Sequence, residues 1–161
     1  MSEAAASREA AMIVDDVLEE VRGEQPGFQH LAAPMDKRGA HFFVNQNSRE
    51  PMSEPEEMVP LWKILDRVGA DWTYSSKGWA AENFCMFTGD EEAWRNVIKK
   101  RVDAVNDLGC QVWLNTECGH SYYTMWQGVK RFGLDAPDLD WRGELLSDDG
   151  SHFRLWRKGV A

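Results

Sequence analysis

CQVWLNT, residues 110–116, is a nearly continuous apolar run that decides the fold of this 161-residue chain. A strand with one face in water alternates apolar and polar residues, whereas a strand buried on both faces does not. The stretch therefore predicts a strand with helices on both of its faces. A helix is expected immediately after it, from 119 to about 132.

Two further strands are expected upstream, AHFFVNQ at 40–46 and ADWTYSS at 70–76. A helix that ends at Gly69 precedes the second strand, and a long helix capped by Thr88-Gly89-Asp90 runs from there to Leu108-Gly109. Alternating strands and helices predict an α/β fold with a small parallel sheet flanked by helices. The intervening stretch NSREPMSEP is expected to be a loop, and Pro60 is expected to kink the following helix or to shift its start.

Residues 7–22 repeat apolar side chains at Ile13, Val17 and Val21, with Val14 and Leu18 beside them, which is the stripe of an amphipathic helix. Two interpretations are open: a helix packed on its own domain, or an arm that docks on a partner. The chain divides into an N-terminal helix and loop at 1–37, an α/β domain at 38–134 and a C-terminal extension at 135–161. In the extension, SDDG between two apolar stretches is compatible with a hairpin turn.

The amino-acid composition of the chain argues against two classes of protein. The net charge of −9 argues against a nucleic-acid partner, and three cysteines without a close pair argue against a secreted disulfide scaffold. The N-terminal segment has no apolar signal core, and no apolar run is long enough to cross a membrane. We expect a cytoplasmic chain, with any membrane association passing through a partner subunit.

Three loops should meet at one edge of the predicted sheet, because sites in parallel sheets lie outside the carboxyl ends of the strands. These loops are Asn45-Gln46-Asn47, Ser75-Ser76-Lys77-Gly78 and Glu117-Cys118-Gly119-His120. The last loop lies where the predicted strand is followed by the predicted helix, and it contains both a thiol and an imidazole. The expected edge of the sheet is therefore the candidate site.

Cys118 should lie at the amino end of a helix, where free amides favour a thiolate, although Glu117 next to it opposes this. A thiolate there would ligate a soft metal or attack a disulfide; a buried, inert cysteine is the alternative. His120 is open to three roles: a ligand, a proton donor or a helix cap. Cys85 and Cys110 have apolar neighbours and are expected in the core.

The segments DWTYSSKGWAAENFCMFTGD (71–90) and DLGCQVWLNTECGHSYY (107–123) resemble the cysteine-rich CCG domain of heterodisulfide reductase-type iron–sulfur subunits, HdrD/DsrK-like. The resemblance covers roughly residues 38–134. It implies a small Rossmann-like α/β unit that is one half of a tandem. Complete domains of this family use cysteines from the three loops to hold an unusual [4Fe–4S] cluster that reduces a disulfide or trisulfide.

The resemblance assigns the cluster-binding positions to Asn45, to the pair Ser75-Ser76, and to Asn115 and Cys118 as the two ends of a Cys-x-x-Cys motif; only Cys118 is a cysteine. Serine stays protonated at neutral pH and is a poor ligand for iron, which prefers thiolates in such clusters. The chain therefore resembles a degenerate half. No cluster is expected on the isolated chain, and the [4Fe–4S] cluster would be shared with or supplied by a partner domain or chain.

The function implied is an electron-transfer module of a heterodisulfide reductase-like (DsrK-like) complex in sulfur metabolism, not active alone. Cys118 would be the metal ligand, His120 would give a proton to the departing sulfur, and Glu117 would set the protonation of the imidazole. The expected partners are other subunits of a redox complex, soluble or membrane-bound. The expected substrate is a small thiol/disulfide protein or a small-molecule disulfide. The alternative is a non-catalytic structural or assembly domain in which Cys118 is inert.

Overall fold

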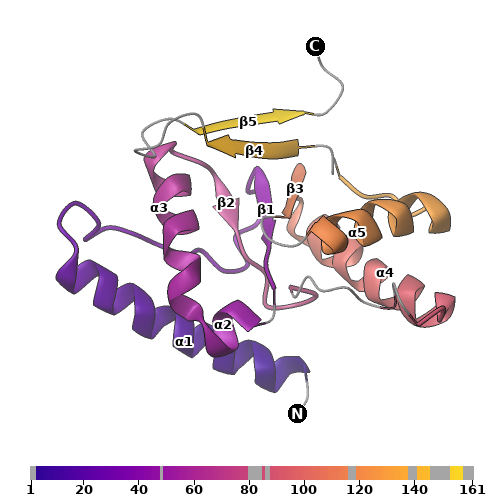
Figure 1. The fold of residues 1–161 in the computed structure, drawn as a ribbon, viewed down its shortest axis with the longest axis horizontal. Helices are drawn as coiled ribbons and strands as arrows, with labels where there is room; N and C mark the ends of the chain where they lie inside the picture. Colours follow the sequence, from indigo (N-terminus) through magenta and orange to yellow (C-terminus); the bar gives the residue numbers. More distant parts are fainter. Residues whose placement is uncertain are drawn as a thin grey trace.

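A computed structural model of the chain describes residues 3–47, 49–79, 85, 88–115, 119–137, 141–145 and 153–157. For residues 3–8 and for the last two of these ranges it describes the backbone alone. The fold has a central sheet between two layers of helices (Figure 1). The α/β class predicted from the alternating strands and helices is therefore confirmed.

The sheet has three parallel strands in the order β2-β1-β3, so the first strand in the chain lies in the middle. They are β1 (Phe42–Asn45), β2 (Trp72–Thr73) and β3 (Val112–Asn115). Phe42 aligns with both Trp72 and Val112 in the register. Each strand is shorter than its predicted apolar run, but all three begin level with one another and point the same way.

One face of the sheet is covered by α1 (Glu3–Glu24) and α3 (Val59–Arg67). Leu114 and Val44 meet Trp62 and Leu65 of α3 in this layer, and all four side chains are buried. On α1 the buried stripe is Ala10, Val14, Leu18 and Val21. The N-terminal helix thus packs on its own domain. Val14, Leu18 and Val21 of the predicted stripe are buried, whereas Ile13 and Val17 are half-buried.

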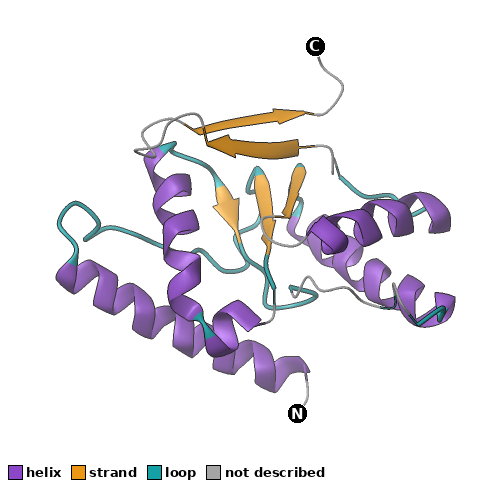
Figure 2. Ribbon diagram, viewed as in Figure 1, coloured by secondary structure: helices purple, strands orange, loops and turns teal. Residues whose placement is uncertain are grey.

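The other face is covered by α4 (Glu91–Leu108) and α5 (Gly119–Phe132), which Figure 2 shows on the far side of the sheet from α1 and α3. Phe43 and Trp113 point into this layer and pack edge to face at 6.4 Å between ring centroids. The predicted cap of α4 is confirmed, because the Asp90 side chain accepts a hydrogen bond from the Ala93 amide at 2.9 Å. The helix ends before Gly109, as predicted.

The prediction of a loop between β1 and the following helix was wrong in part. Residues Arg49–Ser53 form a short helix, α2, and Pro55–Met58 form a 3₁₀ turn, η1. Pro60 lies in the first turn of α3, where the amide that proline lacks would have no helical partner. Pro60 therefore shifts the start of the helix and does not kink it.

In the C-terminal extension, β4 (Trp141–Leu145) pairs antiparallel with β5 (Phe153–Arg157). The SDDG stretch that suggested a turn lies outside the described residues. Figure 1 places the two strands at the end of the sheet opposite to α2, which follows the carboxyl end of β1. The strands β4 and β5 thus lie away from the carboxyl edge of the sheet. Among the described helices, none is long and apolar enough to cross a membrane.

Candidate functional site at the carboxyl edge of the sheet

Asn45 and Asn115 end the two strands at the centre of the candidate site. They are partners in the register of β1 and β3, and Nδ2 of Asn45 lies 3.5 Å from Oδ1 of Asn115. Asn45 is completely buried, with Nδ2 also 3.8 Å from the Met125 sulfur of α5. The position that the resemblance assigns to a cluster ligand is therefore occupied by a neutral amide covered by α5.

Ser75 follows β2, and the register of β1 and β2, continued by two residues, places it level with Asn45. Ser75 is buried, and its hydroxyl accepts a hydrogen bond from the Lys77 amide at 3.1 Å. This bond lies within a two-residue turn typical of serine. The hydroxyl of Ser75 therefore helps to shape the loop that follows β2.

Ser76 is held by Asp36, a residue that the sequence did not point to. The Ser76 amide donates to Oδ1 of Asp36 at 2.9 Å and the Ser76 hydroxyl donates to Oδ2 at 2.6 Å. Asp36 itself has a left-handed backbone, with φ of 55°. Aspartate tolerates that conformation better than most residues do, since its short polar side chain bonds locally. The pair Ser75-Ser76 is thus fixed from two sides.

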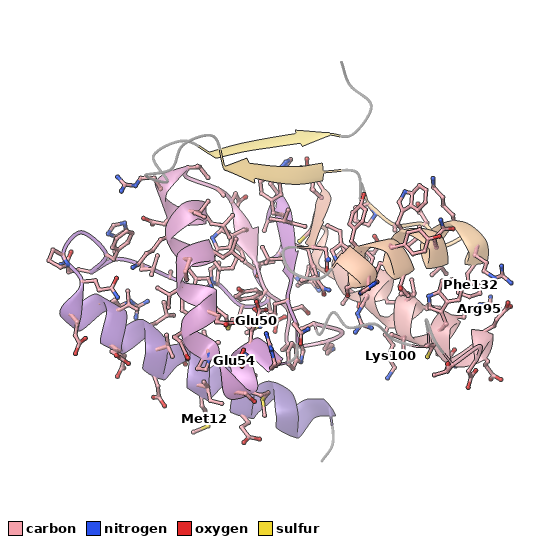
Figure 3. All side chains as sticks on the ribbon, viewed as in Figure 1. Met12, Glu50, Glu54, Arg95, Lys100 and Phe132 are labelled. Atoms are coloured by element: carbon pink, nitrogen blue, oxygen red, sulfur yellow. The ribbon has the colours of Figure 1, made fainter. Side chains whose placement is uncertain are left out.

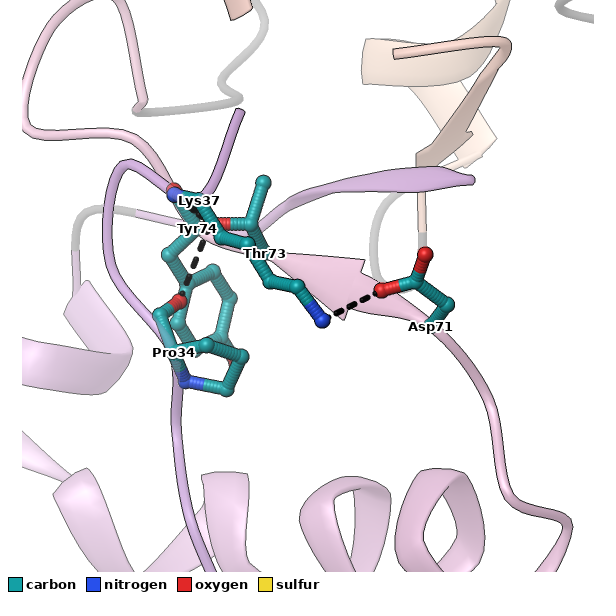
Figure 4. Close-up of polar contacts among 5 residues, drawn as sticks. All are labelled: Pro34, Lys37, Asp71, Thr73 and Tyr74. Carbon is teal, nitrogen blue, oxygen red and sulfur yellow. Dashed lines mark hydrogen bonds and ion pairs between the residues drawn. The ribbon is translucent and has the colours of Figure 1, made fainter. Parts of the chain in front are cut away.

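The segment from Pro34 to Lys37 extends the sheet beyond β2 (Figure 4), with a parallel bridge between Met35 and Tyr74. Tyr74 donates its amide to the Pro34 carbonyl at 2.8 Å, and the Asp36 amide donates to the Tyr74 carbonyl at 2.9 Å. The Lys37 ammonium lies 2.7 Å from the Asp71 carboxylate, and this hydrogen bond lowers the pKa of Asp71. These bonds protect the edge of the sheet that β2 would otherwise expose.

Gly78 closes the same loop against α4. It has a left-handed φ of 58°, and a β carbon there would lie 2.9 Å from the carbonyl oxygen of Lys100. Lys100 lies on α4, as labelled in Figure 3. The glycine in the motif Ser75-Ser76-Lys77-Gly78 therefore has a steric reason, since only glycine combines this backbone with this close approach.

Gln46, next to Asn45, points to the other face of the sheet, toward α1. It is buried beside a cavity of about 10 Å³ that is also lined by Tyr74, Ser75 and Ser76. Among the described residues the Gln46 side-chain oxygen has no hydrogen-bond partner. A space of this size holds at most one water molecule. This cavity is too small for a cofactor.

His120 lies in the first turn of α5 and is exposed. Glu117 and Cys118, the other predicted members of the site, lie outside the described residues. The structure therefore brings Asn45, Ser75 and the start of α5 to one edge, as the topology predicted. The roles predicted for Glu117, Cys118 and His120 stay predictions.

The two remaining cysteines differ from each other. Cys110 is buried, which confirms its predicted place in the core; burial, together with the charge of Asp71, raises the pKa of its thiol. The prediction for Cys85 was wrong, because this residue is only partly buried and lines a surface groove. Its apolar sequence neighbours suggested burial, but Cys85 adopts a left-handed turn with φ of 56° just before α4.

Among the residues that the structure describes, no group of three or more histidine, cysteine, aspartate or glutamate side chains is placed to hold a metal ion. Comparisons with protein-family models, with curated proteins and with solved structures gave no match to this chain. The described part of the site offers amides and hydroxyls, most of them engaged in internal hydrogen bonds. Chemistry at this edge would therefore depend on the loop between β3 and α5.

Asp36 and Met125 are the site residues that sequence reasoning missed. Asp36 lies about forty positions before Ser76 in the chain, and no local motif links the two. Met125 follows the helical spacing of α5, and this spacing indicates an ordinary core residue. Of Asp36, Met125 and Gly78, the sequence indicated Gly78 alone, because its spacing from the serine pair belongs to the motif Ser75-Ser76-Lys77-Gly78.

Proposed function

We propose that the chain is the redox module of a heterodisulfide reductase-like complex in sulfur metabolism, working in the cytoplasm. It would contribute one wall of a [4Fe–4S] site that reduces a disulfide or persulfide. Cys118 would be its thiolate ligand and His120 its proton donor, with Glu117 beside them. The remaining ligands, and the cluster itself, would come from a partner domain or chain.

The observation that carries this proposal is the order of the strands. The three loops that the resemblance assigns to the ligand set follow three adjacent parallel strands, which end at the same edge. A ligand set scattered over the fold would have removed the basis for the proposal. The motif residues Ser75, Ser76 and Gly78 also shape one loop at this edge.

Two features of the described residues support a half site over a complete one. Asn45 is a buried amide against Met125, and the Ser76 hydroxyl is bonded to the Asp36 carboxylate. Neither group competes with a thiolate for iron. A partner that supplies several thiolates is therefore required for the cluster.

Restoring the missing cysteines tests the ligand set directly. The variant Asn45→Cys, Ser75→Cys, Ser76→Cys, Asn115→Cys is reconstituted anaerobically with iron and sulfide, beside the unchanged chain. After one-electron reduction with dithionite, we expect a [4Fe–4S]+ signal by electron paramagnetic resonance in the variant and none in the unchanged chain. Adding Cys118→Ala to the variant should remove or alter the signal, whereas adding Cys85→Ala should leave it intact.

Two results would contradict the proposal. A full cluster on the unchanged chain would show that no partner is needed. A folded four-cysteine variant that takes up no cluster would show that these loops are not a ligand set. Circular dichroism of each variant separates the second result from simple misfolding.

A second candidate function is a non-catalytic assembly domain of a redox complex. It is favoured by the hydrogen bonds of Ser75 and Ser76, which give both serines a structural role. Alkylation separates the two candidates: a Cys118 thiol that reacts quickly at neutral pH favours chemistry, and one that is silent in the folded chain favours assembly.

A further inference from the structure

An open groove of about 650 Å³ lies between the start of α4 and the outer face of α5. Its volume is in the range typical of small-molecule sites. The groove is formed by residues that play no part in the carboxyl edge of the sheet. An inference about it is therefore independent of the function proposed above.

Two aromatic side chains give the groove its apolar surface. Trp94 of α4 is half-buried, and its indole nitrogen donates to the Thr124 carbonyl at 3.3 Å. Tyr123 of α5 is 51% exposed, one of the most exposed large apolar side chains in the described chain. Flat rings exposed on the wall of a groove favour a flat, apolar ligand, because ring stacking adds to the burial of area.

A buried hydroxyl adds a polar feature. Thr124 lines the groove, and its side chain is only 2% exposed. Among the described residues its hydroxyl has no hydrogen-bond partner. A buried polar group in this state is costly, and because its oxygen is covered it gains a partner when neighbouring side chains move to admit a ligand atom.

Four charged side chains are among the described residues that line the groove: Asp90, Glu91, Lys130 and Arg131. Arg131 forms an ion pair with Glu91, and the Asp90 carboxylate caps α4. Lys130 has its ammonium 3.7 Å from the centroid of the Trp126 ring and, among the described residues, no carboxylate partner. Lys130 is therefore the cation of the groove that no described carboxylate pairs with.

We infer that this groove binds a small planar aromatic carboxylate. The ring system lies against Trp94 and Tyr123, the carboxylate meets the Lys130 ammonium, and a ligand oxygen pairs with the Thr124 hydroxyl. Cys85 also lines the groove, so the bound ligand covers its thiol.

The test uses 2-naphthoate as the probe and the full chain as the protein. Binding is followed by the ¹H–¹⁵N signal of the Trp94 indole, assigned with Trp94→Phe, and by the protection of Cys85 from iodoacetamide. We expect a saturable shift and slower alkylation of Cys85. The neutral 2-naphthylmethanol should bind about fivefold more weakly, which is the size typical of an exposed ion pair.

Matched variants separate the three contacts. Lys130→Gln should weaken naphthoate binding about fivefold, whereas Lys99→Gln, which removes an exposed lysine paired with Asp103, should not change it. Thr124→Val should weaken binding by roughly fivefold, and Thr124→Ser, which keeps the hydroxyl, should restore it.

Three results would overturn the inference. The first is a shift that never saturates within the solubility of naphthoate. The second is equal affinity for naphthoate and for the neutral alcohol, and the third is a Lys130→Gln variant that binds as the unchanged chain does. None of these results depends on whether an iron–sulfur cluster is ever formed.

Discussion

Asn45 and Asn115 lie side by side at the ends of β1 and β3, with 3.5 Å between Nδ2 of the first and Oδ1 of the second. Asn45 is fully buried, and Met125 covers its amide from α5. The innermost part of the candidate site is therefore neutral and closed to water. Any charged group placed there has to be stabilised by the protein alone.

Asn45→Asp tests this environment with a side chain of the same shape. A buried carboxylate loses its hydration and faces the Asn115 oxygen, so we expect a loss of about 3 kcal/mol in the free energy of unfolding at pH 7. Burial raises the pKa of such a carboxyl above its unfolded value of about 3.9, so the lost stability should return as the pH falls towards that value. Urea unfolding at pH 7 and pH 4.5 measures the difference. Asn115→Asp, at a half-buried position, is the control and should cost less; equal small losses at both pH values would show that Asn45 is hydrated.

Tyr74→Phe removes a buried hydrogen bond beneath the site. The Trp62 indole donates to the Tyr74 hydroxyl at 2.9 Å, and both rings are buried in the layer between the sheet and α3. Without the hydroxyl the indole N–H has no acceptor, and we expect a loss of about 1–3 kcal/mol in the free energy of unfolding. Tyr123→Phe, at an exposed tyrosine, should change it by less than about 0.5 kcal/mol.

The same tyrosine predicts an alkaline limit to stability. Burial raises the pKa of the Tyr74 hydroxyl above its usual range. A pKa that is higher in the folded chain gives stability that is complete below about pH 10 and is lost as the pH rises further. Tyr74→Phe should therefore flatten the decline of stability between about pH 10 and pH 11.5. A variant with the same alkaline decline as the unchanged chain would contradict this.

Asp36 joins the serine pair to the edge of the sheet, and two variants test what its side chain contributes there. Asp36→Ala loses two hydrogen bonds to Ser76 and places alanine at a φ of 55°, so we expect a loss of about 2 kcal/mol. Asp36→Asn keeps an acceptor and a tolerated backbone, and should lose about 1 kcal/mol or less. Thermal or urea unfolding measures both. Equal losses for the two variants would mean that neither the acceptor nor the tolerated backbone that asparagine keeps contributes to stability.

Much of the sheet was predictable from local sequence, because each strand carries its own apolar run. CQVWLNT contains β3, and the cap at Asp90 fixed the start of α4. Since parallel strands share one carboxyl edge, the meeting of the loops after β1 and β2 also followed from the pattern. What did not follow was α2, because the polar stretch Arg49–Ser53 has no apolar stripe.

The contacts that shape the candidate site were beyond sequence reasoning for a physical reason. Asp36 bonds to Ser76, and Asn45 contacts Met125, across long separations in the chain. Such pairs depend on how the layers are assembled and leave no periodicity in the sequence. The prediction for Cys85 was wrong for the same reason. Its apolar neighbours in the sequence do not indicate the left-handed turn that places Cys85 on the groove.

Cys110 and Cys85 should differ in their rates of alkylation. Burial and the nearby charge of Asp71 raise the pKa of the Cys110 thiol, so it holds its proton and is closed to reagent, whereas Cys85 is partly exposed. We expect iodoacetamide at pH 7.5 to label Cys85 at least about tenfold faster than Cys110. Peptide mass spectrometry at timed intervals measures the two rates. In urea the two rates should converge, and a difference that persists there would show that the folded structure is not its cause.

Gly128→Ala tests how closely α5 approaches α4. A β carbon at this position would lie 2.9 Å from Cγ1 of Ile98 and 3.0 Å from the Trp94 indole nitrogen. Alanine is favoured over glycine by about 1 kcal/mol within a helix, but overpacking a buried contact costs about 1–3 kcal/mol, so we expect a net loss of about 1 kcal/mol. Gly119→Ala lies on the same helix with nothing within 4 Å of the added carbon, and it should be neutral or slightly stabilising.

The displaced side chain in Gly128→Ala is the indole that lines the groove. The hydrogen bond from Trp94 to the Thr124 carbonyl should lengthen, so the indole ¹H–¹⁵N signal should move in the free chain and naphthoate should bind more weakly. A variant that loses stability while its indole signal and naphthoate affinity stay unchanged would place the strain on Ile98 alone. In that case the wall of the groove does not depend on the close approach of the two helices.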